Sequence, residues 1–129
     1  MQVNKLYWER YEADRDTWTA FKRMATELIY PGLQLISNES GDVFGFHSDD
    51  GGEAFIVHRL GSEDAYCRTH SGAYVRDIAI CLVLLRSLGL ARQILADNSA
   101  CFLPALEAVH ARFPQRKYTK LREYFADRS

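Results

Sequence analysis

Ile78-Ala79-Ile80-Cys81-Leu82-Val83-Leu84-Leu85 is the longest uninterrupted apolar run in the chain. Neighbouring apolar residues continue it at helical spacing, from Tyr74 to Leu88, and Gly89 is placed to end the helix. Because this helix is apolar on nearly all sides, we expect it to lie in the interior. Its eight-residue apolar run is too short for a membrane span, which needs about 20 residues.

The sequence before this run alternates with a period of two. Short segments rich in aromatic and β-branched residues predict strands at 33–36, 42–47, 54–60 and 65–69. The segments between them are rich in Gly, Asp, Asn and Ser, and each is too short for a crossover helix. This pattern predicts an antiparallel meander of three or four strands.

Helices are expected on both sides of the meander. Asp14 and Asp16 precede an apolar stripe at helical spacing, which Tyr30-Pro31-Gly32 ends. We expect 6–11 to form a turn or a helix, and 91–96 to form a short turn. Further helices are predicted from about Leu103, because proline suits a first helical turn, and after Pro114. The apolar face of the last helix comprises Tyr118, Leu121, Tyr124 and Phe125.

The predicted fold class is therefore α+β. It consists of an N-terminal helix, an antiparallel meander of three or four strands, and then three or four helices including a buried central helix. With 129 residues, 47% hydrophobic and 26% charged, the chain is expected to form a single domain over 1–129.

The beginning of the sequence and the cysteines bear on the compartment. No apolar segment of signal-peptide length follows Met1. Cys67, Cys81 and Cys101 are an odd number without the spacing of a disulfide framework. We therefore expect a cytoplasmic protein, a monomer or a homodimer, with no membrane association.

His47, His58, Cys67 and His70 are the candidates for a metal site or a cysteine-based enzyme, because imidazole and thiolate bind zinc. If an Asp-rich hairpin turn follows His47, that residue lies opposite Ala54, and His58 lies roughly 13 Å further along the same face. Cys67 and His70 are an odd number of positions apart, so an extended chain places them on opposite faces. We predict no metal site, no cofactor and no catalytic residue.

Charge is distributed unevenly along the chain. Residues 1–70 carry twelve acidic and seven basic residues, net −5, whereas 71–129 carry five acidic and nine basic residues, net +4. Acidic residues at turns project into water and suit a basic partner surface. The predicted partner-binding residues are Asp49, Asp50, Glu53, Glu63 and Asp64.

Two readings of the interface stay open. The acidic turns can form it, or they can simply keep the surface soluble and guard the sheet edges. Lys117, Lys120 and Arg122 of the last predicted helix are the basic alternative. The aromatic candidates for interface anchors are Trp8, Tyr11, Tyr66 and Tyr74.

Five segments follow one another in a recognisable order: Gly41-Asp42-Val43-Phe44-Gly45-Phe46, Ser48-Asp49-Asp50, Gly61-Ser62-Glu63-Asp64, Ile78-Ala79-Ile80-Cys81-Leu82, and Val109 to Pro114. In these segments the chain resembles the antirestriction family represented by ArdB and KlcA. The resemblance covers about 30–114, and the first strand lacks the tryptophan of that family. It implies a small non-enzymatic α+β protein from a plasmid or phage that blunts a bacterial defence system, and it supplies no catalytic residues.

The expected function is a non-enzymatic, protein-binding inhibitor. It would antagonise a restriction or CRISPR complex by occluding a basic surface that otherwise binds nucleic acid, without itself contacting nucleic acid. One alternative is an immunity protein that neutralises a toxin domain. The other is a small metal protein or enzyme that uses His47, His58, Cys67 or His70.

Overall fold

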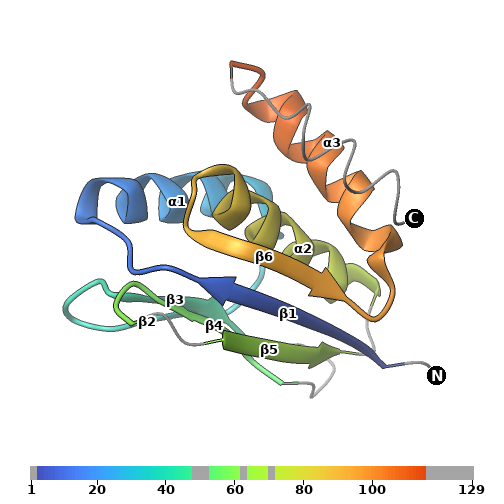
Figure 1. Cartoon of the computed structure of the whole chain (residues 1–129), viewed down its shortest axis with the longest axis horizontal. Helices are drawn as coiled ribbons and strands as arrows, with labels where there is room; N and C mark the ends of the chain where they lie inside the picture. The colour runs from blue at the N-terminus through green and yellow to red at the C-terminus, as the bar shows by residue number, and fades with distance from the viewer. Residues whose placement is uncertain (1–2, 48–52, 62–63, 70–71, 116–129) are drawn as a thin grey trace.

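The computed structural model describes residues 3–47, 53–61, 64–69 and 72–115 (Figure 1). The fold class is α+β, as predicted. In chain order the elements are β1 (Asn4–Arg10), α1 (Arg15–Leu28), β2 (Leu35–Ser37), β3 (Val43–Phe46), β4 (Phe55–His58), β5 (Asp64–Thr69), α2 (Gly72–Ser87), β6 (Ala91–Ala96), the 3-10 turn η1 (Ser99–Cys101) and α3 (Phe102–Arg112).

The strands form two antiparallel sheets, where the sequence predicted one meander. Sheet A has the order β5-β1-β6, and sheet B has the order β2-β3-β4. Sheet B is the meander, in which Phe46 pairs with both Leu35 and Phe55. The fourth predicted strand, β5, pairs instead with β1.

A turn at the end of sheet B redirects the chain towards sheet A. Gly61 has a φ of 83°, a conformation that glycine adopts without strain. The Arg10 guanidinium donates to the carbonyl oxygens of Leu60 at 2.7 Å and Gly61 at 2.6 Å. This buried cation from sheet A therefore fixes the point at which the chain leaves sheet B.

The prediction of a turn or helix at 6–11 was wrong, because this segment is mostly strand β1. Leu6, Trp8 and Arg10 are buried, and the residues between them are partly exposed. That is the period of two of a strand. This alternation is hard to recognise in the sequence, because one of the inward positions is occupied by a charged residue, Arg10. The first element of the described residues is therefore a strand and not the predicted N-terminal helix, and α1 follows it.

The prediction of a turn at 91–96 was also wrong. This segment is β6, which pairs along β1 and buries Ala91 and Ile94. Gly89 ends α2 with a φ of 77°, and Leu90 N–H donates to the Leu85 carbonyl at 2.8 Å. α2 therefore stops just before Gly89, and the chain continues directly into β6.

α1 begins at the predicted acidic residue. The Asp14 side chain caps the helix by accepting from the Thr17 backbone N–H at 3.1 Å. Trp18, Phe21 and Ala25 of its predicted apolar stripe are buried. α3 begins close to the predicted position, with a proline in its first turn.

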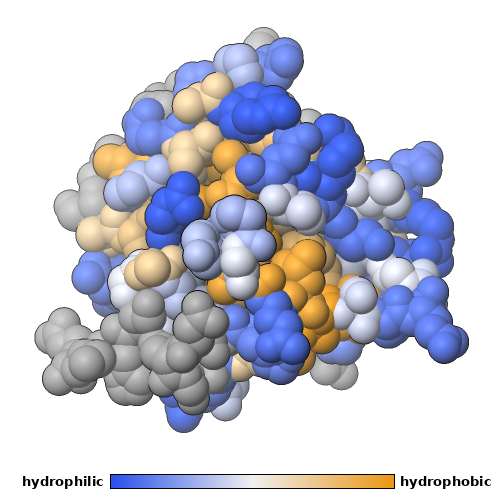
Figure 2. Space-filling model, turned by 180° about the vertical axis from the view of Figure 1, so that it is seen from behind, coloured by the Kyte–Doolittle hydropathy of each residue, from blue (hydrophilic) through white to orange (hydrophobic). Residues whose placement is uncertain are grey.

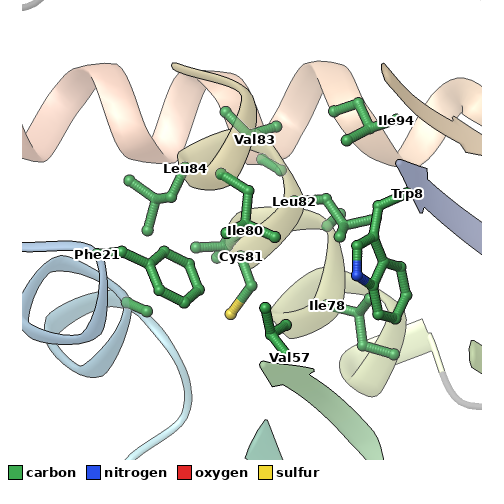
Figure 3. Close-up of a cluster of buried hydrophobic side chains, with 14 of the residues drawn as sticks. Trp8, Phe21, Val57, Ile78, Ile80, Cys81, Leu82, Val83, Leu84 and Ile94 are labelled. Atoms are coloured by element: carbon green, nitrogen blue, oxygen red, sulfur yellow. The ribbon is translucent and has the colours of Figure 1, made fainter. Parts of the chain in front are cut away.

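The apolar run 78–85 is fully buried within α2. Figure 1 shows α2 behind β6, with α1 on one side and α3 on the other. Figure 3 shows its side chains pointing towards Phe21 of α1, Val57 of β4 and Trp8 of β1. Both sheets therefore cover the same helix.

Among the helices of the described residues, none has the length and apolarity that crossing a membrane requires. The predicted last helix, with Tyr118, Leu121, Tyr124 and Phe125, and the basic residues Lys117, Lys120 and Arg122 lie outside the described residues.

Candidate functional site

The outward side of sheet A carries a row of large side chains across three strands. Register places Tyr7 of β1 between Tyr66 of β5 and Leu95 of β6. Tyr66 is 49% exposed and Leu95 is 37% exposed. Lys5 and Arg68 form the adjoining pair on the same side. We call Lys5, Tyr7, Tyr66, Arg68 and Leu95 the tyrosine face.

Cations lie over the two aromatic rings of this face. The Tyr7 and Tyr66 ring centroids are 6.4 Å apart. Lys5 Nζ lies 4.2 Å from the Tyr66 centroid and 4.9 Å from that of Tyr7, and Arg68 Cζ lies 5.3 Å from the Tyr66 centroid. These cation–π contacts hold the rings and their charged neighbours in one arrangement.

Acidic residues border the tyrosine face. Arg68 Nη1 lies 3.7 Å from Glu53 Oε1. This ion pair joins β5 to the segment just before β4. Glu9 of β1 accepts from Arg92 Nε at 2.8 Å. Register pairs Glu9 with Asp64 on β5. The face thus has aromatic residues and an arginine, which are enriched where proteins bind proteins, and acidic groups at its border, where such interfaces are polar.

Of the five predicted partner-binding residues, the structure places two. Glu53 is exposed and pairs with Arg68 as described above, and Asp64 begins β5. Asp49, Asp50 and Glu63 lie outside the described residues. Glu53 thus adjoins the tyrosine face through Arg68, and Asp64 occupies the position of β5 two residues before Tyr66.

Asp42, another acid of the hairpin region, has cationic partners. Its Oδ1 lies 2.7 Å from Arg59 Nε and 3.3 Å from Arg15 Nη2. The hydrogen bond from Arg59 lowers the pKa of this carboxyl below its usual value of 3.8. Arg59 also donates to the Ala13 carbonyl at 2.9 Å. Asp42 therefore joins sheet B to the start of α1.

The histidines and the cysteine proposed for metal or nucleophile chemistry lie in different surroundings. His47 and His58 are exposed, whereas Cys67 is fully buried, and His70 lies outside the described residues. The β3–β4 register continues towards the expected pairing of His47 with Ala54. Within 3–47, 53–61, 64–69 and 72–115, no group of three or more His, Cys, Asp or Glu residues is placed to hold a metal ion.

Cys67 lies in surroundings that favour its thiol over its thiolate. Its Sγ lies 3.5 Å from the Glu53 carbonyl oxygen and 3.8 Å from that of Ala54. Burial, and then the negative charge of Glu53, raise the pKa of Cys67 to about 12. Because the thiolate is the nucleophile and the metal ligand, this environment opposes both functions at neutral pH.

Two of the four predicted aromatic anchors are exposed and two are not. Tyr11 and Tyr66 are each 49% exposed, whereas Trp8 is 2% and Tyr74 is 4% exposed. Trp8 packs on Phe55 in the core, and the Tyr74 hydroxyl lies 2.9 Å from the Glu53 carbonyl oxygen. Trp8 and Tyr74 are thus structural residues, which corrects the prediction.

Sequence reasoning missed Lys5, Tyr7 and Leu95 as parts of this surface. Because 6–11 was interpreted as a turn or helix and 91–96 as a turn, these three residues had no common sheet. The signal was present in β1, where Lys5, Tyr7 and Glu9 alternate with inward-facing residues. Only pairing through β1 brings Tyr66 and Leu95 into one row.

Comparisons of the chain with protein-family models, with curated proteins and with solved structures find no match. The resemblance to the antirestriction family accordingly stays a prediction from the sequence.

Proposed function

We propose that the protein is a non-enzymatic, protein-binding antagonist of a bacterial defence complex of the restriction or CRISPR type. The tyrosine face and the acidic residues beside it would form its contact surface. The observation that carries the binding proposal is the aromatic and apolar row Tyr66–Tyr7–Leu95 across the three strands of sheet A, in which Tyr66 and Leu95 are exposed and Tyr7 between them is partly exposed. The choice of partner rests on the family resemblance and on the excess of acidic residues in 1–70.

A rigid aromatic row is suited to a protein partner. Tyrosine buries a large area on binding and loses little conformational entropy, because its ring has few rotatable bonds. Tyr7 and Tyr66 are already held by each other and by Lys5. Their ordering in the free protein reduces the entropy that binding must remove.

The acidic residues would supply electrostatic complementarity. A basic groove that binds nucleic acid attracts carboxylates by the same long-range field. Asp49, Asp50, Glu53, Glu63 and Asp64 are the carboxylates we assign to this contact. By occupying the groove, they would exclude phosphate without any chemical step.

A phage-plating assay tests the proposal. The chain is expressed in bacteria that carry a defined restriction or CRISPR system, and phage titres are compared with and without expression. We expect expression to raise the titre, and purified protein to bind the purified defence complex. Tyr66→Ala should weaken that binding by roughly 30-fold, the effect of a typical aromatic hot spot of about 2 kcal/mol.

Tyr30→Ala is the matched control, because Tyr30 is 58% exposed and lies outside the tyrosine face. This variant should bind like the wild type. Combined replacement of Asp49, Asp50 and Glu53 by lysine should abolish protection of the phage. Equal binding by this triple variant would exclude these acids, and unchanged titres with every restriction and CRISPR system tried would contradict the proposed class of partner.

The immunity-protein alternative predicts a different partner. In that case the chain would form a stable complex with a secreted nuclease or other toxin domain and would protect cells from that toxin. Co-expression with candidate toxin domains, read out as cell survival, separates the two functions.

A further inference from the structure

A second surface feature lies away from the tyrosine face, between α1 and the edge of sheet B. It is an open groove of about 540 Å³. One wall is the flank of α1, with Lys22, Arg23 and Glu27, and the floor and other wall belong to β2 and β3, with Leu35, Ser37 and Phe44. Figure 2 shows the back of the molecule, where apolar surface is exposed between hydrophilic side chains.

The groove runs along an unpaired strand edge. Among the strands of the described residues, β2 pairs only with β3, so its other side is an edge of sheet B. His47 N–H donates to the Gln34 carbonyl at 3.0 Å, which makes these two residues a hydrogen-bonded pair of the antiparallel ladder. Such pairs alternate along the strand. The peptide groups of Leu35 and Ser37 therefore point away from β3, towards the edge.

The same two residues expose side-chain surface. Leu35 is 49% exposed, although its ladder partner Phe46 is fully buried. A strand added beside β2 would cover Leu35, and its inward side chains would meet the flank of α1. The groove thus has the position that a further strand of sheet B would occupy.

The charges at the rim favour an acidic occupant. Lys22 Nζ donates to the Gly41 carbonyl at 2.9 Å, which satisfies one of its donors. The Glu27 carboxylate is paired with Arg112 at 2.9 Å. Arg23 is exposed, and no carboxylate among the described residues pairs with it. Lys22 and Arg23 therefore keep positive charge at the rim of the groove, whereas the charge of Glu27 is balanced by Arg112.

We propose that this groove binds an extended segment of a protein partner in which apolar and acidic residues alternate, and that the segment adds as a strand to the free edge of β2. The N–H and C=O groups of Leu35 and Ser37 would pair with its backbone. Alternate apolar side chains would cover Leu35, and a carboxylate would pair with Arg23. The site is independent of the tyrosine face.

A second copy of the chain fits this groove less well. An edge-to-edge pairing of two β2 strands about a twofold axis would bring two sets of Lys22 and Arg23 to one interface. Like charges at such an interface oppose association. The acidic segment avoids this repulsion and uses the same backbone groups.

Selection from a displayed library of short random linear peptides, followed by NMR on a selected peptide, tests the proposal. We expect selected sequences to alternate apolar residues with Asp or Glu. In the free protein the Leu35 and Ser37 amides should exchange hydrogen rapidly, and bound peptide should slow both. The Ile36 amide, already paired with β3, serves as the internal control because its protection should not change.

Three variants complete the test. Ser37→Pro removes an N–H that makes no bond to β3, so sheet B should keep its fold. Peptide affinity should fall at least tenfold, which corresponds to the loss of one hydrogen bond and of the strand pairing around it. Arg23→Glu should weaken binding at least about fivefold. Arg86→Glu makes the same charge change on exposed α2 surface and should have no effect.

The proposal is overturned if no peptide is enriched, or if enriched peptides lack acidic residues. It is equally overturned if bound peptide leaves the Leu35 and Ser37 amides unprotected. A concentration-dependent dimer that Ser37→Pro dissolves would assign the edge to a second copy instead.

Discussion

The carboxyl groups of Asp42 and Asp77 lie in opposite surroundings. Asp42 lies near the surface between Arg59 and Arg15, and the Arg59 hydrogen bond lowers its pKa. Asp77 is 3% exposed within α2, and its Oδ1 accepts from the Tyr30 backbone N–H at 3.2 Å. Burial raises the pKa of Asp77 in spite of that hydrogen bond and the nearby Arg76. The folded state thus favours the ionised form of one and disfavours that of the other.

These shifts predict opposite pH effects for two asparagine variants. Asp77→Asn should raise the free energy of unfolding at pH 7, because burial disfavours the ionised carboxylate in the folded wild type. The gain should shrink as the pH falls through the raised pKa of folded Asp77 towards the reference value of 3.8, and it should be absent below 3.8, where Asp77 is protonated in both states. Asp42→Asn should lower the free energy of unfolding at pH 7, and this loss should vanish as Asp42 is protonated at low pH.

Urea unfolding of the wild type and both variants at several pH values measures these differences. The two difference curves should have opposite signs at pH 7 and converge towards zero in acid. An Asp77→Asn variant that is less stable than the wild type at pH 7 would show that the Tyr30 and Arg76 contacts outweigh the burial of the charge.

At the scale of elements, the central strand of sheet B depends on one residue without a side chain. Gly45 of β3 is buried opposite Ile56 of β4. A Cβ at this position would overlap the Phe55 carbonyl oxygen and lie 3.0 Å from Ile56 Cα. Backbone atoms cannot move aside as a flexible side chain can, so β3 and β4 pair this closely only with glycine here.

Gly45→Ala should therefore destabilise the protein by roughly 1–3 kcal/mol, the usual range for overpacking. Gly72→Ala is the control, because an added Cβ there meets nothing within 4 Å. At the first residue of α2 it should be neutral or stabilise by up to about 1 kcal/mol. Denaturant unfolding compares the two, and equal stabilities would contradict the close approach of β3 and β4.

The success of sequence-based prediction varied with the kind of signal in each element. α1, β3 and β4 have strong local patterns: a capping aspartate and a clear stripe in the helix, and aromatic alternation in the strands. β1 and β6 have weaker ones, since Arg10 takes an inward position in β1, and the buried residues of β6, Ala91 and Ile94, are three positions apart rather than two. Their strand character depends on pairing with each other, a long-range contact that local periodicity does not encode.

The residues of the candidate site could likewise be predicted only where a local pattern in the sequence marked them. Glu53 and Tyr66 stood out in the sequence as an acid near a turn and an exposed aromatic residue. Their neighbours Lys5, Tyr7 and Leu95 could be assigned only after β1 was placed between β5 and β6. Membership of the face was thus set by sheet order.

At the scale of the whole molecule, the two sheets are joined by shared packing and by polar contacts. Both cover α2, and Ile80, Leu82 and Leu84 of that helix are fully buried. Arg10 of sheet A donates to carbonyls at the end of sheet B, and Tyr74 of α2 lies within hydrogen-bonding distance of the Phe46 and Glu53 carbonyl oxygens. Neither sheet can lose its partner without exposing apolar surface.

This arrangement predicts a single cooperative unfolding transition, which the two tryptophans can test separately. Trp8 lies in sheet A, and Trp18 lies in α1, where its Nε1–H donates to the Gly41 carbonyl beside sheet B at 2.6 Å. In a Trp18→Phe variant the fluorescence reports sheet A, and in a Trp8→Phe variant it reports α1 and its contact with sheet B. Within each variant, the fluorescence midpoint in urea should coincide with the far-ultraviolet circular dichroism midpoint, because α2 couples both regions. If the fluorescence transition in either variant precedes the loss of helix signal, the two sheets unfold as separate units and α2 does not couple them.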